Sequence, residues 1–252
     1  MGKIIQTCRD TVSTASVALK APHRLAMTEK LGKGVESEDH NIYEKHVELL
    51  DKYARWVCAF PIAVKNYLRP RMDTKIKCTR SDQLLNEIGF LLDDNEARML
   101  LEAKHPVLLV LDQLRELAYV ICFTVDINLH PTATAEINKQ MNTHLDSLSG
   151  AFGAMERICG TPLPFVYVTH LRTFLLLYLL LFNLYSVAHY GWEALIILLA
   201  ANWAMLGLEA ASVECERPFG LSPNHLPLGK FCIIIAENIV QTLDETKPAF
   251  DH

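Results

Sequence analysis

The side chains best able to do chemistry lie on either side of a long apolar segment in the C-terminal half of the chain. His170 and Arg172 precede this segment, Asn202 lies within it, and it is followed by three carboxylates, Glu209, Glu214 and Glu216. These carboxylates could form ion pairs with Arg217. Their spacing does not place all three on one helical face, which argues against a metal site. A lone amide such as Asn202 should face a neighbouring helix or a water-filled path.

The rest of the sequence offers no pattern typical of an enzyme. It has no G-x-S-x-G, no H-E-x-x-H, no glycine-rich phosphate loop and no local Cys–His pair. We therefore expect no catalytic residue, no metal and no cofactor. A net charge of −5 without a basic block argues against a nucleic-acid partner. The dispersed cysteines predict reduced thiols buried in helices; they are Cys8, Cys58, Cys78, Cys122, Cys159, Cys215 and Cys232.

The apolar segment consists of two short runs, Thr173–Ala188 and Ala194–Gly207. Each falls short of the ~20 residues that a helix needs to cross a hydrocarbon core, but the flanking residues 167–172 and 208–213 supply the missing length. A buried hairpin of a soluble bundle is the alternative. The run Leu-Leu-Leu-Tyr-Leu-Leu-Leu-Phe argues against it, because a helix that is apolar on every face needs apolar surroundings all round. A cluster of aromatic residues at the tip of the hairpin suits a membrane interface; they are Tyr185, Tyr190 and Trp192.

Upstream of this hairpin, apolar residues recur at helical spacing and nothing predicts a strand, so the fold class is all-α. We expect a helix over 4–19, a loop over 23–38, and a helix over 42–68 that Pro61 kinks and Pro70 ends. A short helix should follow from Ser81 or Asp82 to Leu92, and Asp93 should cap the next one. Two long helices should open at Pro106 and after Pro131. Their expected core positions are Val107, Leu108, Leu111, Leu114, Ala118, Ile121, Ile137, Met141, Leu145, Leu148, Phe152 and Met155.

These elements predict three regions. Residues 1–160 form a long-helix cytosolic bundle, residues 161–213 a transmembrane hairpin, and residues 214–252 a cytosolic segment that packs back on the bundle. Thr161-Pro162-Leu163-Pro164 breaks the chain sharply where bundle and hairpin meet, since two prolines remove two amide donors. This break is either a simple helix terminator or a fixed constriction. Arg172 is equally open to a structural interpretation, as a snorkelling anchor at the membrane boundary.

The residues around the hairpin carry a resemblance. The pattern E-R-x-x-x-T-P-x-P-F-x-Y-x-x-x-x-R runs from Glu156 to Arg172, and it is followed by G-L-E, E-x-P-F-G and N-x-L-P-L. Together they resemble the bestrophin and bestrophin-like anion channels, in the bacterial and plant-type branch. Weaker similarity extends upstream through Arg55-Trp56 and His105-Pro106. The motif residues are Glu156, Arg157, Tyr167, Arg172, Glu209, Glu216, Pro218, Phe219, Gly220, Asn224 and Pro227.

The resemblance implies a homopentamer in a membrane, with four membrane helices per subunit and one ion path along the fivefold axis. Chloride, and in some members bicarbonate, would pass a hydrophobic neck and then a second constriction near the T-P-x-P break. Carried to this chain, the constriction candidates are Ile158, Thr161, Pro162 and Pro164. The acidic run that follows P-F-G in animal members is replaced by Leu221-Ser222-Pro223-Asn224, so we expect no calcium switch of that type.

One departure from the family pattern shapes the functional expectation. The chain starts where the family has already passed its first membrane hairpin and its pore-lining neck, so we expect an N-terminally truncated channel subunit. The rival from another class is a non-conducting interaction subunit that assembles with full-length homologues. A soluble or peripheral helical bundle is the third alternative. The expected location is a membrane, as a multi-pass protein, with plastid and plasma membranes as the options.

Overall fold

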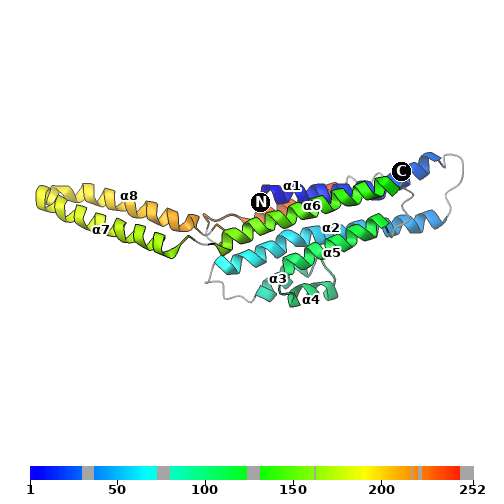
Figure 1. Ribbon diagram of the computed structural model, residues 1–252, viewed down its shortest axis with the longest axis horizontal. Helices are drawn as coiled ribbons and strands as arrows, with labels where there is room; N and C mark the ends of the chain where they lie inside the picture. The colour runs from blue at the N-terminus through cyan, green and yellow to red at the C-terminus, as the bar shows by residue number, and fades with distance from the viewer. Residues whose placement is uncertain are drawn as a thin grey trace. The chain divides into compact units, whose positions relative to one another are not determined.

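The computed structural model describes residues 1–29, 37–72, 80–123, 131–161, 163–216, 218–220 and 223–244, and these residues contain helices and turns but no strand. This confirms the all-α fold class. The chain divides into two compact units, Met1–Met155 with Pro227–His252, and Glu156–Leu226. The described elements are α1 (Gly2–Glu29), α2 (Ser37–Met72), α3 (Arg80–Ile88), α4 (Asp94–Glu102), α5 (Pro106–Phe123), α6 (Pro131–Gly160), α7 (Phe165–Tyr190), η1 (Gly191–Glu193), α8 (Ala194–Cys215) and α9 (Leu228–Asp244) (Figure 1).

The first unit, called the helical body below, is organised around α2. This helix packs against α1, α3, α5 and α9, and its residues from Leu50 to Leu68 are almost all buried. Trp56, Tyr53 and Phe60 are each 0% exposed. A helix surrounded on all sides must be apolar on nearly all faces, and the sequence W-V-C-A-F-P-I-A-V supplies that.

The two long helices after α4 largely follow the predicted spacing. α5 opens at Pro106, which suits the first helical turn because proline has no N–H to leave unpaired there. Its buried stripe contains the expected positions except Leu108, which is 45% exposed because it lies off the face shared by Val107, Leu111 and Leu114. On α6 the expected positions from Met141 to Met155 are buried, whereas Ile137 near its start is only half-buried. Tyr67 of α2 meets Phe152 of α6 edge-on, with ring centroids 5.5 Å apart.

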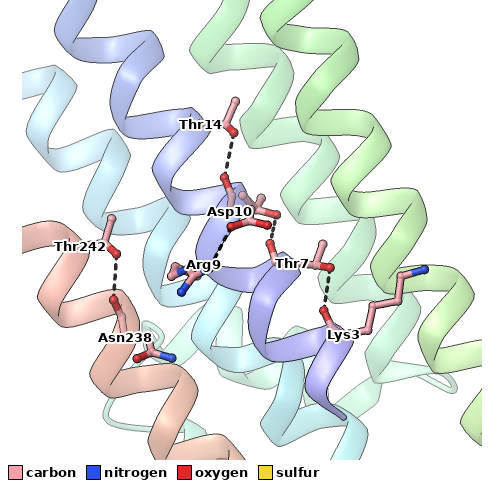
Figure 2. Close-up of polar contacts among 8 residues, drawn as sticks. Lys3, Thr7, Arg9, Asp10, Thr14, Asn238 and Thr242 are labelled. Carbon is pink, nitrogen blue, oxygen red and sulfur yellow. Dashed lines mark hydrogen bonds and ion pairs between the residues drawn. The ribbon is translucent and has the colours of Figure 1, made fainter.

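The last described helix returns to the helical body. α9 packs against α1 and α2 and buries Leu228, Ile235 and Ile239. Figure 2 shows how α1 and α9 satisfy their own hydroxyl groups: Thr7 and Thr242 each donate to the backbone carbonyl four residues earlier, at 2.7 and 2.9 Å. A buried hydroxyl without a partner is costly. These bonds therefore let α1 bury threonines against its neighbours without loss of stability.

A polar contact fixes the short helix α3 onto α2. Lys65 Nζ lies 2.6 Å from the carboxylate of Glu87, and Asn66 Nδ2 donates to the same carboxylate at 2.9 Å. Lys65 is 6% exposed and Asn66 4%, so both would be costly to bury alone. The Glu87 carboxylate thus neutralises the lysine and accepts the amide hydrogen in one arrangement.

Several predicted helix ends are wrong. α1 continues to Glu29, so the loop predicted from residue 23 is helical in its first part, where Leu25, Ala26 and Met27 are strong helix formers. α2 begins at Ser37 and ends at Met72, two residues beyond Pro70. α3 ends at Ile88 rather than at Leu92, and the residue that follows it is Gly89, a poor helix former. Asp93 does precede α4, but its side chain makes no capping hydrogen bond.

The cysteines only partly match the expectation of buried thiols. Cys8 and Cys122 are buried, while Cys215 is exposed on α8. Cys78 lies outside the described residues. In the helical body, burial raises the pKa of the Cys58 thiol to about 12 and that of Cys122 to about 11. These thiols are therefore protonated and unreactive near neutral pH.

Candidate functional site: an apolar hairpin and its polar contacts

The second unit is built on a hairpin of two long apolar helices, α7 and α8. They are joined by the short 3-10 turn η1, where Gly191 adopts a positive φ of 59° that other residues rarely accept. By length and composition, the continuous segment Phe165–Cys215 qualifies as one candidate membrane span, with a hydropathy of 1.8. Two helices of 26 and 22 residues within it are each long enough to cross a hydrocarbon core of ~30 Å.

The hairpin exposes the side chains that a soluble domain would bury. Phe165, Ile196 and Trp203 are between 79% and 81% exposed, and only 11% of the most apolar window is buried. The contacts between the two helices bury a narrow seam instead; its most buried members are Leu179, Ser186, Ala194 and Leu198. Because no aqueous surface favours such a layer of large apolar groups, the exposed faces require lipid or further apolar helices.

Two amides meet halfway along this seam. Asn183 of α7 and Asn202 of α8 exchange two hydrogen bonds, at 3.2 and 3.0 Å, so each amide donates to the other's carbonyl oxygen. Both residues are half-buried. The sequence predicts that Asn202 faces either a neighbouring helix or a water-filled path, and in the structure it faces Asn183 on the neighbouring helix. In an apolar surrounding this pair fixes the register of the two helices.

An ionic cluster closes the base of the hairpin. Arg172 of α7 pairs through its Nε with Glu209 of α8, and its guanidinium also lies 4.0 Å from Glu216. Both carboxylate side chains are largely shielded, at 29% and 26% exposure. Arg172 therefore contacts two carboxylates across the hairpin, a more specific role than that of a snorkelling anchor.

The segment after α8 is held close to the same end of that helix. Asn224 donates to Glu214, and the N–H of Leu226 donates to the carbonyl of Pro218 at 2.9 Å, which closes the P-F-G segment into a turn. Phe219 is 3% exposed. A side chain at Gly220 would collide with the ring of His225, so a larger residue at this position would have to displace that ring. Arg217, Leu221 and Ser222 lie outside the described residues.

The constriction candidates lie at the break between α6 and α7. α6 ends at Gly160, and Thr161 closes it by donating from both its N–H and its hydroxyl to the carbonyl of Arg157, at 2.9 and 2.6 Å. Pro164 precedes α7 in an extended conformation. Ile158 is 52% exposed and Tyr167 57% exposed. Pro162 lies outside the described residues.

The predicted site residues therefore separate into two groups. Arg172, Glu209 and Glu216 come together with the turn that holds Phe219, Gly220 and Asn224. The second group flanks the helix break and contains Ile158, Thr161, Pro164 and Tyr167, together with Glu156 and Arg157 in the last turns of α6. Pro227 belongs to neither group, because it directly precedes α9 in the helical body. Sequence reasoning missed Asn183 and Ser186. A signal existed for Asn183, because an asparagine inside each of two facing apolar runs indicates a pair.

The fold and this site define an α-helical protein with a hairpin long enough to span a membrane. Comparison with known proteins gives the family. Residues 2–241 match the family described as Bacterial/Fungal Bestrophin protein. A voltage-dependent anion channel-forming protein of Nostoc sp. is 37% identical over 103 residues, which cover 41% of this chain and 32% of that protein. A voltage-dependent anion channel-forming protein of Synechocystis sp. is 28% identical over 193 residues, which cover 75% of this chain and 56% of that protein.

The chain thus belongs to the bacterial/fungal bestrophin family. A crystal structure of a bacterial bestrophin homolog from Klebsiella pneumoniae matches 96% of this chain and 79% of that chain, with a TM-score of 0.68 and 19% identity, and so supports the fold. The family assignment and the exposed apolar hairpin together make this a membrane protein. The chain spans about a third to somewhat over half of the length of these two channel-forming relatives.

Proposed function

We propose that this chain is a subunit of an anion channel that passes chloride across a membrane and assembles as a homopentamer. The family match over residues 2–241 is the observation that carries this proposal. Related proteins from Nostoc and Synechocystis are named as channel-forming, which supports transport rather than catalysis. The proposal includes bicarbonate as a second anion to be tested.

The hairpin supports this proposal through its chemistry. Its outward faces are largely apolar, and two pairs of polar side chains, Asn183 with Asn202 and Arg172 with Glu209, contact each other between α7 and α8. Anion passage needs no catalytic group; it needs weak sites and constrictions that control hydration. We assign to the hairpin the role of a membrane-embedded scaffold in each subunit, with the ion path formed where subunits meet.

The break between α6 and α7 is our proposed constriction. Ile158, Thr161 and Pro164 are exposed, so their side chains are free to face a path formed by several subunits. The hydroxyl of Thr161 is already bonded to the carbonyl of Arg157, which leaves an apolar surface at Ile158. Such a ring would favour weakly hydrated anions over strongly hydrated ones.

Flux into liposomes tests the function. The chain, purified in detergent and reconstituted alone and together with the full-length Nostoc relative, should carry chloride in at least one of these preparations. Flux should be insensitive to replacement of sodium by a large organic cation. Ile158→Ala should raise the relative permeability of strongly hydrated anions, while Ile233→Ala, an exposed isoleucine on α9, serves as the matched control.

Assembly is measured separately on the detergent-solubilised protein. Light scattering corrected for detergent should give five times the 28.4 kDa of one chain. Stable co-purification with the full-length relative, combined with a loss of that relative's flux, would instead favour a non-conducting interaction subunit. Absence of flux in both preparations with correct assembly would refute the channel proposal. Fractionation of source-cell membranes would decide between the plastid and plasma membranes.

A further inference from the structure

A cavity lies at the tip of the hairpin, far along α7 and α8 from the ionic cluster. Its volume is about 540 Å³. It is lined by aromatic rings and one carboxylate together with aliphatic side chains; the main lining residues are Phe182, Tyr185, Ser186, Tyr190, Glu193 and Ile197. A volume of this size is typical of sites for small molecules or lipid head groups.

The side chains that line the cavity favour a cation as the ligand. Three aromatic rings and the carboxylate of Glu193 line one cavity, and a ring face combined with a negative charge is the usual receptor for an alkylammonium group. Glu193 is the only charged residue in the lining, and among the residues that the structure describes it has no ion-pair partner. His189 is the nearby titratable group outside the lining, and its ring stacks on Tyr185 with centroids 5.9 Å apart.

The position of the cavity indicates where such a cation comes from. The cavity lies at the end of two membrane-length helices, next to the turn η1, where the hairpin meets the head-group layer. Ile197 continues the apolar surface of α8 toward the hydrocarbon core and is 70% exposed. An ammonium group in the cavity would therefore be joined to a chain lying along an exposed aliphatic face, as in a phospholipid.

We propose that the hairpin tip binds the ammonium head group of a phospholipid, with Tyr185, Tyr190 and Glu193 around the ammonium and the acyl chain along Ile197. The buried hydroxyl of Ser186, which is 7% exposed, donates to an ester or phosphate oxygen of the same lipid. This inference requires only that the hairpin lies in a membrane, so it stands or falls independently of the anion-channel proposal.

Lipid retention tests it. The chain, purified in detergent, is incubated with equal amounts of phosphatidylethanolamine, phosphatidylcholine and phosphatidylglycerol of identical acyl chains, and retained lipids are quantified by native mass spectrometry. We expect the two ammonium lipids to be retained in preference to phosphatidylglycerol. Glu193→Gln and Tyr190→Leu should each lower that preference by about twofold to fivefold, in line with the strength of cation–π and ionic contacts at exposed sites.

The control is Trp192→Leu, which removes an aromatic residue at the same tip that is 89% exposed and does not line the cavity. It should leave the preference unchanged. Equal retention of phosphatidylglycerol, or an equal effect of the control and the two lining variants, would overturn the proposal. A change in complex mass for Glu193→Gln without a change in lipid preference would show that protein, not lipid, covers the cavity, and would overturn it as well. Helical content and complex mass of each variant confirm that it is folded.

Discussion

The helical body and the hairpin use the same types of side chain in opposite ways. In the body, Trp56 is 0% exposed and the charged residues mostly face outward; in the hairpin, Trp203 is 79% exposed and the amides and ion pairs lie between the helices. The physical rule is the same in both regions, since each helix buries the side chains that its surroundings solvate poorly. The comparison teaches that the two units face different solvents, water and lipid.

The largest expected effect is the difference in stability between variants of two tryptophans, one in the helical body and one in the hairpin. Trp56→Ala should destabilise the helical body by about 3–5 kcal/mol, because it removes a large side chain from a packed core and leaves a cavity. Trp203→Ala should change the stability of the body by less than about 0.5 kcal/mol. Hydrogen exchange of α2 amides in detergent measures both. Similar losses of stability for the two variants would show that Trp56 and Trp203 do not lie in different surroundings.

A smaller effect concerns the polar contact that Lys65 and Asn66 of α2 make with Glu87 of α3. Glu87→Gln removes the charge that balances the buried Lys65, and should cost about 2 kcal/mol. Replacing both partners, as Lys65→Met with Glu87→Leu, should recover a large part of this loss because no buried charge remains unpaired. Thermal unfolding followed by circular dichroism is the measurement. If the double variant were less stable than the single one, packing rather than charge balance would hold α3 in place.

The pH dependence of the helical body should reveal its buried thiols. Burial, aided by the negative charge of Asp51, raises the pKa of Cys58 from 9.0 to about 12. Below pH 9 the thiol is protonated in both states, so its stabilising contribution is complete. Between pH 9 and 12 the unfolded chain ionises first, and the free energy of unfolding falls, by about 1 kcal/mol at pH 10.

Urea unfolding at pH 8 and pH 10 measures this loss, with Cys58→Ala as the variant that should reduce it. Cys215→Ala is the matched control, because Cys215 is exposed on the hairpin. An unchanged pH dependence in Cys58→Ala would show that the burial of this thiol contributes nothing to it.

The smallest expected effect lies in the hairpin seam. Asn183→Leu should destabilise the pairing of α7 and α8 by about 0.6 kcal/mol, the average for a hydrogen bond between membrane helices. The double variant Asn183→Leu with Asn202→Leu should recover most of that loss, since no unpaired amide is left in lipid. Steric trapping or unfolding in mixed micelles measures the difference. Strict additivity of the two single variants would argue against a direct contact.

Patterns along the chain predicted much of the fold. The stripe from Met141 to Met155 on α6 and the apolar hairpin followed from residue spacing alone, because helical period and lipid solvation act locally. Helix ends were predicted less well. The prediction that Pro70 ends α2 was wrong by two residues, and Leu108 on α5 is exposed, because packing around each helix decides which borderline positions are covered.

The sequence alone determined the class of the protein and the lipid-facing nature of its hairpin, since these depend on composition, periodicity and motif residues in order along the chain. Only the tertiary structure decided which residues meet. Arg172 and Glu209 lie 37 positions apart, and Asn183 and Asn202 lie 19 apart. The pairing of polar groups across α7 and α8 depends on the turn at Gly191, where the chain reverses its direction, and on the register of the two helices. The cavity at Glu193 likewise exists only once those helices lie side by side.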